Sequence, residues 1–160
     1  MKLIFSFFFL LCFSSTSNLV EIRKAFPNAA QNESSASAFA SKLAEVSNDD
    51  KTLVAYKGAS ITMVSKFKKK ISEKISTFKE GAKLIESAVA SEPNNIEIRL
   101  VRLSVQENVP GITNYKKSIK DDAAFILKHY NEQNNALKDY IRSFISHSKS
   151  FSVEEKQSIK

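Results

Sequence analysis

Apolar residues recur along most of the chain with the spacing of α-helices. From residue 53 onward they stay nearly in step with 3.6 residues per turn, which alone would permit one helix of about 40 residues. Helices of that length are rare, and residues 68–70, three consecutive lysines, suit a helix C-terminus, where cations complement the negative end of the dipole. We therefore predict a break between residues 67 and 71. The apolar positions are Leu53, Tyr56, Met63, Phe67, Ile71, Ile75, Phe78, Ile85 and Val89.

Shorter apolar stripes predict helices before this region. Asn18 could cap a short helix that stops before Pro27, and Ser34 or Ser35 could cap a second one. The second helix would carry a stripe with i, i+4, i+7 spacing. Residues 48–50, Asn-Asp-Asp, would end it and cap the next helix. The stripe consists of Phe39, Leu43 and Val46.

The C-terminal third shows the same alternation of stripes and caps. Pro110 and Gly111 predict a turn, and Ser118 with Asp121 resembles a capping pair that opens a helix. Residues 134–135, two asparagines, separate that helix from another. Residues 152–155 have the spacing of a capping box, but a last helix of about eight residues should fray unless it is docked.

A helical hairpin junction is the clearest local feature. Residues 78–103 are typical of one helix that ends near Ser91 and a second that begins just past Asn95. The segment 96–105 is apolar on nearly all sides, which a buried helix or a strand could explain. Its position directly after Pro93 favours the helix.

This junction resembles the tetratricopeptide repeat family. Phe78, Gly81, Ile85, Ala88 and Pro93 stand at offsets 0, 3, 7, 10 and 15, the spacing of the second helix and closing proline of such a unit. The resemblance covers one degenerate unit, roughly residues 53–107. It implies a stack of helical hairpins that binds a partner and seldom performs chemistry.

The first helix of that unit departs from the family pattern. The residues directly before the junction lack the expected bulky residue, Leu-Gly pair and Tyr. Tyr56, Gly58 and Ala59 could make a close helix contact further upstream. In relatives the first helix of each pair lines the concave face, which here implies residues 53–66 and 96–106.

Composition points to the same fold class. The 160 residues include only three glycines and three prolines, too few to supply the turns of an all-β or α/β protein. We therefore predict an all-α fold of antiparallel helical hairpins, either a tetratricopeptide-like stack or a small bundle of six to seven helices.

The first residues predict export. Lys2, the largely apolar run 3–13 and the small residues after it have the anatomy of a secretory signal peptide that is cut before Asn18, and the run is too short to span a bilayer. An uncleaved anchor, or lipidation at Cys12, is the alternative. Residues 18–160 would then form one domain in the periplasm or outside the cell of a bacterium. They hold no cysteine and carry a formal charge of +6.

Two groups of residues are candidates for partner binding. Arg99, Arg102 and Gln106 form a polar stripe on an otherwise apolar helix, with Tyr115 in the following loop. Arginine's planar fork suits acidic groups of a protein or peptide. The alternative is a structural one, in which these arginines pair with nearby carboxylates and fix the helix register. The carboxylates in question are Glu97, Asp121 and Asp122.

The second candidate is the basic segment Lys66 to Lys74, whose five lysines alternate with Phe67, Ile71 and Ile75. Such a segment could bind anionic lipid or glycan through charge. A solvated turn is the alternative. Export and the lack of a nucleic-acid binding motif argue against nucleic acid.

No pattern predicts catalysis. Phosphate loops, nucleophile elbows and zinc-protease motifs are missing from the sequence, and a metal site would have to assemble from His129, Glu132 and His147. We expect a non-catalytic binding protein without a cofactor or metal.

Overall fold

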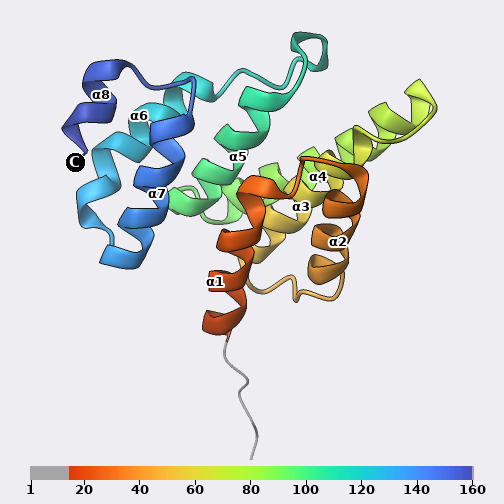
Figure 1. Ribbon diagram of the computed structural model, residues 1–160, viewed down its shortest axis with the longest axis horizontal. Helices are drawn as coiled ribbons and strands as arrows, with labels where there is room; N and C mark the ends of the chain where they lie inside the picture. The colour runs from red at the N-terminus through yellow and green to blue at the C-terminus, as the bar shows by residue number, and fades with distance from the viewer. Residues whose placement is uncertain (1–14, 160) are drawn as a thin grey trace, which may run out of the picture.

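The computed structural model describes residues 15–159, and this part of the chain is all helical (Figure 1). It contains eight α-helices and three short 3-10 helices, and no strand occurs among the described residues. The predicted all-α fold is confirmed. The α-helices are α1 Ser15–Ala25, α2 Glu33–Leu43, α3 Lys51–Ser65, α4 Ile71–Ser91, α5 Ile96–Asn108, α6 Ile119–His129, α7 Asn135–His147 and α8 Val153–Ser158. The 3-10 helices are η1 Phe26–Asn28, η2 Gly111–Thr113 and η3 Tyr130–Glu132.

The hairpin of α3 and α4 is held by a very close backbone approach. A Cβ atom added at Gly58 of α3 would lie 2.5 Å from the carbonyl oxygen of Gly81 in α4, and one added at Gly81 would lie 2.4 Å from the carbonyl oxygen of Gly58. Side chains of any size are excluded at both positions, so the two helices can pack with their backbones in contact. The close helix contact expected around Gly58 is therefore present, and its partner is Gly81.

Helix α5 lies between two hydrophobic cores. One face, with Ile98, Val101 and Val105, packs into a core shared with α1 to α4. Another face, with Leu100 and Leu103, packs into a core built from α6, α7 and the C-terminal residues. This double burial explains why the segment is apolar on nearly all sides.

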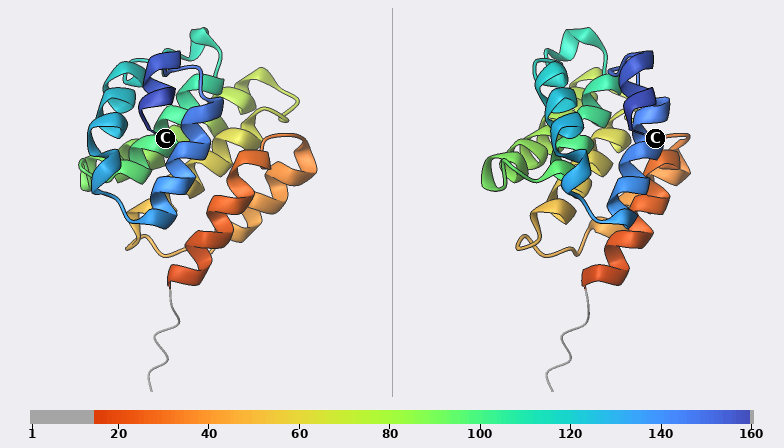
Figure 2. Two further views of the ribbon diagram at one scale, coloured as in Figure 1. Left: turned by 60° about the vertical axis from the view of Figure 1, so that its left-hand side comes forward. Right: turned by 90° about the vertical axis from the view of Figure 1, so that its left-hand side faces the viewer.

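The flanking helices cover opposite sides of this centre (Figures 1 and 2). Helices α1 and α2 pack on the side of α3, while α6, α7 and α8 form a second layer against α5. Both views in Figure 2 show α1 and α7 beside each other on one side of the molecule.

Most predicted boundaries are confirmed, although several caps differ. The break falls at residues 66–70, but the three lysines follow the end of α3 and do not form its last turn; Lys70 occupies the N-cap position of α4. Asp50 caps α3 as expected, since its side chain accepts a hydrogen bond from the Leu53 backbone N–H. The α4–α5 junction also lies at the expected residues, 92–95.

Two predicted caps are wrong, and a third residue occupies the predicted N-cap position without a capping hydrogen bond. Asn18 lies inside α1, which is already helical at Ser15. Asn32, ahead of Ser34 and Ser35, caps α2. Ser118 sits at the N-cap of α6 without a capping hydrogen bond from its side chain, because its backbone is not in the extended conformation that directs a cap side chain toward the helix.

The C-terminal helix is docked, which brings the number of α-helices in the described residues to eight instead of six or seven. Ser152 and Glu155 form the predicted capping box. Phe151 before the helix and Ile159 after it are both buried in the second core. Anchoring at both ends explains how so short a helix persists.

The predicted signal peptide falls almost entirely outside the described residues. Residues 1–14 are not described, and the predicted cut before Asn18 lies in the first turn of α1. Over residues 15–159, no helix combines the length and apolar character needed to cross a bilayer.

Candidate functional site

The structure places Arg102 in a buried ion cluster between α4, α5 and α6. Its Nε and Nη2 atoms donate to the two carboxylate oxygens of Asp122, each at 2.7 Å, and Nη1 donates to Glu86 at 2.8 Å. Asp122 is fully buried. Burial alone would lower the pKa of Arg102, but the hydrogen bonds and charges of Asp122 and Glu86 outweigh it and raise this pKa above its ordinary value.

Arg99 and Tyr115 join the same cluster. Arg99 donates to Asp122 at 3.0 Å and to the carbonyl oxygen of Pro93 at 2.7 Å, and its guanidinium lies 4.2 Å from the ring centroid of Phe125. The Tyr115 hydroxyl donates to Glu86 at 2.7 Å. Burial, followed by this hydrogen bond, raises the pKa of Tyr115.

Most of the predicted binding residues thus form hydrogen bonds with other residues of the same chain. Arg99, Arg102 and Tyr115 pair with the buried carboxylate of Asp122 and the exposed carboxylate of Glu86, as the structural alternative predicts. Gln106 lies apart from them: it is buried, and its Oε1 atom has no hydrogen-bond partner among the described residues. None of these four residues lines the large cleft described below.

A second buried polar cluster was not predicted. Arg23 of α1 donates to both carboxylate oxygens of Glu97 in α5, at 2.7 and 2.6 Å. The Tyr56 hydroxyl donates to Glu97 at 2.8 Å and shares a hydrogen bond of 3.0 Å with the hydroxyl of Tyr140 in α7. Glu97, considered above as a partner for Arg99 and Arg102, instead binds a residue 74 positions earlier in the chain. This cluster ties α1, α3, α5 and α7 together.

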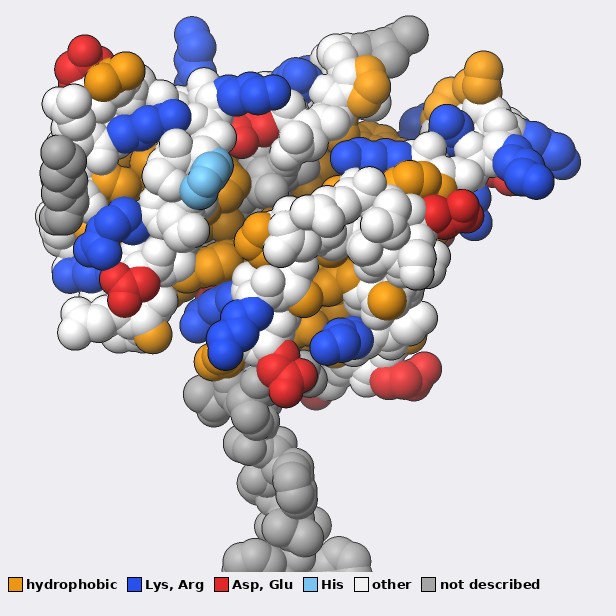
Figure 3. All heavy atoms as spheres, viewed as in Figure 1, with side chains coloured by type: hydrophobic (Ala, Val, Ile, Leu, Met, Phe, Trp, Pro, Cys, Tyr) orange, Lys and Arg blue, Asp and Glu red, His pale blue; other side chains and the backbone are white. Residues whose placement is uncertain are grey.

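A large cleft opens beside this second cluster, between α1 and α7. Its volume is about 1630 Å³, and its walls also include η1, the end of α3, the first turns of α4 and the end of α5. We call it the α1–α7 cleft. Figure 3 shows apolar side chains running through the middle of this face, between α7 and the α1–α2 pair. The large apolar residues that line it include Phe26, Met63, Ile75, Phe78, Val105 and Phe144.

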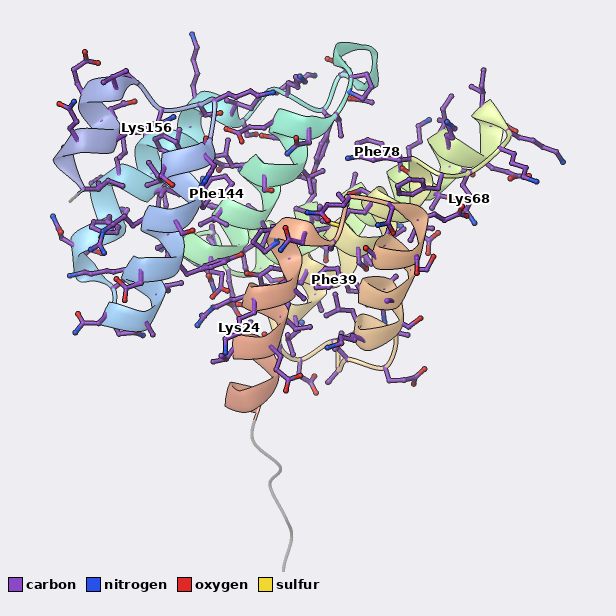
Figure 4. All side chains as sticks on the ribbon, in the orientation of Figure 1. Lys24, Phe39, Lys68, Phe78, Phe144 and Lys156 are labelled. Atoms are coloured by element: carbon purple, nitrogen blue, oxygen red, sulfur yellow. The ribbon has the colours of Figure 1, made fainter. Side chains whose placement is uncertain are left out.

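Two of these aromatic side chains stand on different helices across the cleft. Figure 4 shows Phe144 on α7 and Phe78 on α4, on opposite sides of α5 in that view. Both are half-buried. The ring of Phe78 packs edge-on against Tyr115, with 5.5 Å between centroids. Aromatic groups held in this way offer apolar area at little entropic cost.

The charge around the α1–α7 cleft is strongly positive. Glu107 is the single acidic residue among those that line it, and it is occupied by the Ser148 hydroxyl and by the Ser150 backbone N–H, the latter at 3.0 Å. The cleft therefore combines an apolar interior with a surplus of cations. Its basic residues are Arg23, Lys24, Lys66, Lys74, Lys79 and Lys149.

A smaller hollow of about 540 Å³ lies at the α4–α5 turn. Half of its lining residues belong to the α4–α5 turn, 92–95, and Asn95 is already used to cap α5. Its other apolar members besides Pro93 are Ile96 and Leu137, and both belong to the second core. The α1–α7 cleft is the better candidate for a binding site.

The two histidines form local contacts. His129 lies 2.8 Å from Glu132 on the next turn, and Nδ1 of His147 lies 2.9 Å from the Ser143 carbonyl oxygen. Within residues 15–159, no three His, Cys, Asp or Glu side chains are grouped so that they could hold a metal ion.

The sequence pattern of α7 does not by itself reveal the α1–α7 cleft. Leu137, Ile141 and Ile145 form the core stripe of α7, and all three are buried. Tyr140 and Phe144 form a second stripe one position earlier, with the same i, i+4 spacing. Together the five positions follow the ordinary i, i+3, i+4, i+7, i+8 spacing of a core-facing helix, and Tyr140 and Phe144 also pack against the second core, so periodicity does not distinguish the residues that line the cleft.

No protein-family model, curated protein or solved structure matches this chain. The residues that carry the tetratricopeptide resemblance do form a helix and a turn, since α4 contains Phe78 to Ala88 and Pro93 follows it. The repeat assignment itself stays a prediction.

Proposed function

We propose that the protein is a non-catalytic binding module of the bacterial cell envelope, and that it holds an acidic, amphipathic segment of a partner protein or peptide in the α1–α7 cleft. The observation that carries this proposal is the combination of apolar walls and a basic surround in one large cleft. An amphipathic helix recognised in this way lays its apolar face into the groove and its charged face along the rim.

The size of the α1–α7 cleft supports a peptide segment over a small molecule. Sites for small molecules and cofactors usually measure about 300–1,000 Å³. The volume of about 1630 Å³ exceeds that range. The cleft is also lined by several separate elements, so a ligand can contact α1, α4 and α7 at once.

The charge of the α1–α7 cleft supports an acidic partner. The rim lysines are exposed, and each exposed charge pair contributes little by itself because water and salt screen it. Their summed field speeds encounter and selects against basic partners, while the aromatic groups inside supply affinity. We therefore expect binding that weakens with salt but persists at high salt.

Site-specific photo-crosslinking tests the site directly. The full chain is expressed in a bacterial host, so that any processing occurs naturally, and a photoreactive residue replaces either Ser143 or Ser158. Both serines are exposed, but only Ser143 lines the cleft. Adducts are recovered from envelope extracts at low and high salt, and the crosslinked segment is sequenced.

We expect an adduct at position 143 with one acidic, amphipathic segment, retained at high salt, and no such adduct at position 158. Equal adducts at both positions, or a basic crosslinked segment, would refute the proposal. The mass of the purified protein also reveals whether the chain is cut before Asn18.

A further inference from the structure

The tip of the α3–α4 hairpin projects from the body of the molecule (Figures 1 and 4). We call residues 66–75 the finger. Every residue from 68 to 76 is exposed, which sets this stretch apart from the buried middle of the same hairpin. Figure 4 places Lys68 at its outer end.

The finger exposes apolar side chains that no part of the described chain covers. Ile71 is 76% exposed and Ile75 is 50% exposed. They are four residues apart on α4 and so lie on one helix face. Val20 and Val153 are the other large apolar residues of the described chain that are strongly exposed, and they stand singly. The first two apolar positions of α4 therefore face solvent, whereas Ile85 and Val89 of the same helix are buried.

The finger is also strongly basic. It carries five lysines, Lys66, Lys68, Lys69, Lys70 and Lys74, against the single acid Glu73. Glu73 lies 3.5 Å from the Lys70 ammonium, and both side chains are exposed. The other four lysines have no carboxylate within ion-pair distance among the described residues.

We propose that the finger docks on the surface of an anionic lipid bilayer. Ile71 and Ile75 would enter the boundary between headgroups and acyl chains, and the lysines would contact lipid phosphates. This arrangement of apolar tip and basic flank is that of interfacial membrane-binding helices. A soluble anionic glycan would satisfy the lysines but would leave both isoleucines in water, so the exposed apolar pair favours lipid.

The finger is firmly seated on the protein. The Gly58–Gly81 contact lies about two turns below its start and fixes α4 against α3. Lys66, Ile71, Lys74 and Ile75 also line the end of the α1–α7 cleft. Docking would therefore hold the cleft beside the membrane, a role that goes beyond the proposed binding of a partner segment.

Vesicle binding with matched charge variants tests this inference. The probes are vesicles of phosphatidylglycerol and phosphatidylcholine, and vesicles of phosphatidylcholine alone, each at low and physiological salt. The finger variant is Lys68→Glu, Lys69→Glu and Lys70→Glu, none of which lines the cleft. The control reverses Lys116, Lys117 and Lys120, which are also exposed and change the net charge equally.

The unaltered protein should bind the anionic vesicles and not the phosphatidylcholine vesicles. Each lysine near an anionic surface supports binding roughly 5-fold, so the finger variant should lose at least about 100-fold while the control loses far less. Equal loss in both triple variants would show diffuse charge attraction and overturn the proposal.

A second pair of variants tests the apolar part. Ile71→Ser should weaken vesicle binding about tenfold, whereas Val153→Ser, at the other end of the molecule, should not. Unchanged binding by Ile71→Ser, together with equally tight binding to soluble heparin, would assign the finger to glycan. Crosslinking at position 143 tells the two proposals apart, and in the finger charge variant the adduct should persist although vesicle binding is lost. An adduct at position 143 in an unaltered protein that fails to bind anionic vesicles would refute the finger alone.

Discussion

At the scale of single residues, two glycines decide how the α3–α4 hairpin packs. Gly58 and Gly81 face each other so closely that an added Cβ at either would overlap a backbone carbonyl oxygen. A flexible side chain can move aside, but a helix backbone carbonyl moves only with its helix. The fit depends on the absence of side chains and not on unusual backbone angles, since neither glycine has a positive φ.

We predict that Gly58→Ala destabilises the protein by about 2–3 kcal/mol, because the helices must separate to admit one methyl group. Urea unfolding monitored by circular dichroism measures this change. The control is Gly111→Ala, where an added Cβ meets nothing within 4 Å and the free energy of unfolding should hardly change. An equally small effect at Gly58 would contradict the packing described here.

The sequence shows which small residues could make a close helix contact, but it does not show which of them pair. Gly81 and Ala88 stand two turns apart on one helix face, and small residues with this spacing let a neighbouring backbone approach. Gly58 was recognised as a contact residue, but nothing local states that it meets Gly81 and not another small residue. Such pairing depends on how two helices align, which is a tertiary property.

At the scale of elements, the helix caps lie next to their helices in the sequence, whereas ion pairs between helices join residues that are far apart in it. Asp50 and the 152–155 capping box were predictable because cap and helix are adjacent in sequence. The Arg23–Glu97 pair joins residues 74 positions apart. Glu97 is nearer in sequence to Arg99 and Arg102, so proximity along the chain suggested a different pairing. The α1–α7 cleft escaped prediction for the same reason.

The helices α4, α5 and α6 are joined through one carboxylate, which gives a sharp prediction. Asp122→Ala should lower the free energy of unfolding by about 3 kcal/mol, because it leaves the buried Arg102 short of its main counter-charge. The neighbouring Asp121 is exposed. Asp121→Ala should cost a few tenths of a kcal/mol through the helix dipole. Thermal melts of both variants make the comparison.

If Asp122→Ala leaves stability intact while Arg99 and Arg102 bind an acidic peptide more tightly, the arginines serve recognition instead. Equal losses from both aspartates would point to a general effect of charge at the start of α6.

At the scale of the whole molecule, Tyr56 and Tyr140 join the two hydrophobic cores through a shared polar cluster. Burial, then the neighbouring charges of Tyr140 and Glu97, raises the pKa of Tyr56 well above its ordinary value. Burial likewise raises the pKa of Tyr140. In the unfolded chain both tyrosines ionise near their usual pKa of about 10.

A raised pKa in the folded state makes stability fall with alkali. Below about pH 10 both states hold the phenolic protons and stability is unaffected; above it the unfolded chain releases protons that the folded protein retains. We expect the free energy of unfolding to drop by up to about 1.4 kcal/mol per pH unit for each tyrosine. Tyr56→Phe and Tyr140→Phe together should flatten this slope in urea melts from neutral to alkaline pH. An unchanged slope would mean that other groups control alkaline unfolding.

Helix α5 has a consequence for how the molecule can be divided. Because one of its faces completes each core, removing the chain on either side would leave a long apolar face in water. Neither the N-terminal nor the C-terminal half has a complete hydrophobic core without α5. We therefore expect the helices to melt in a single cooperative step. A protease cut within α5 should unfold both halves together. Neither half could then be transferred to another protein, by evolution or by engineering, as a separate folding unit.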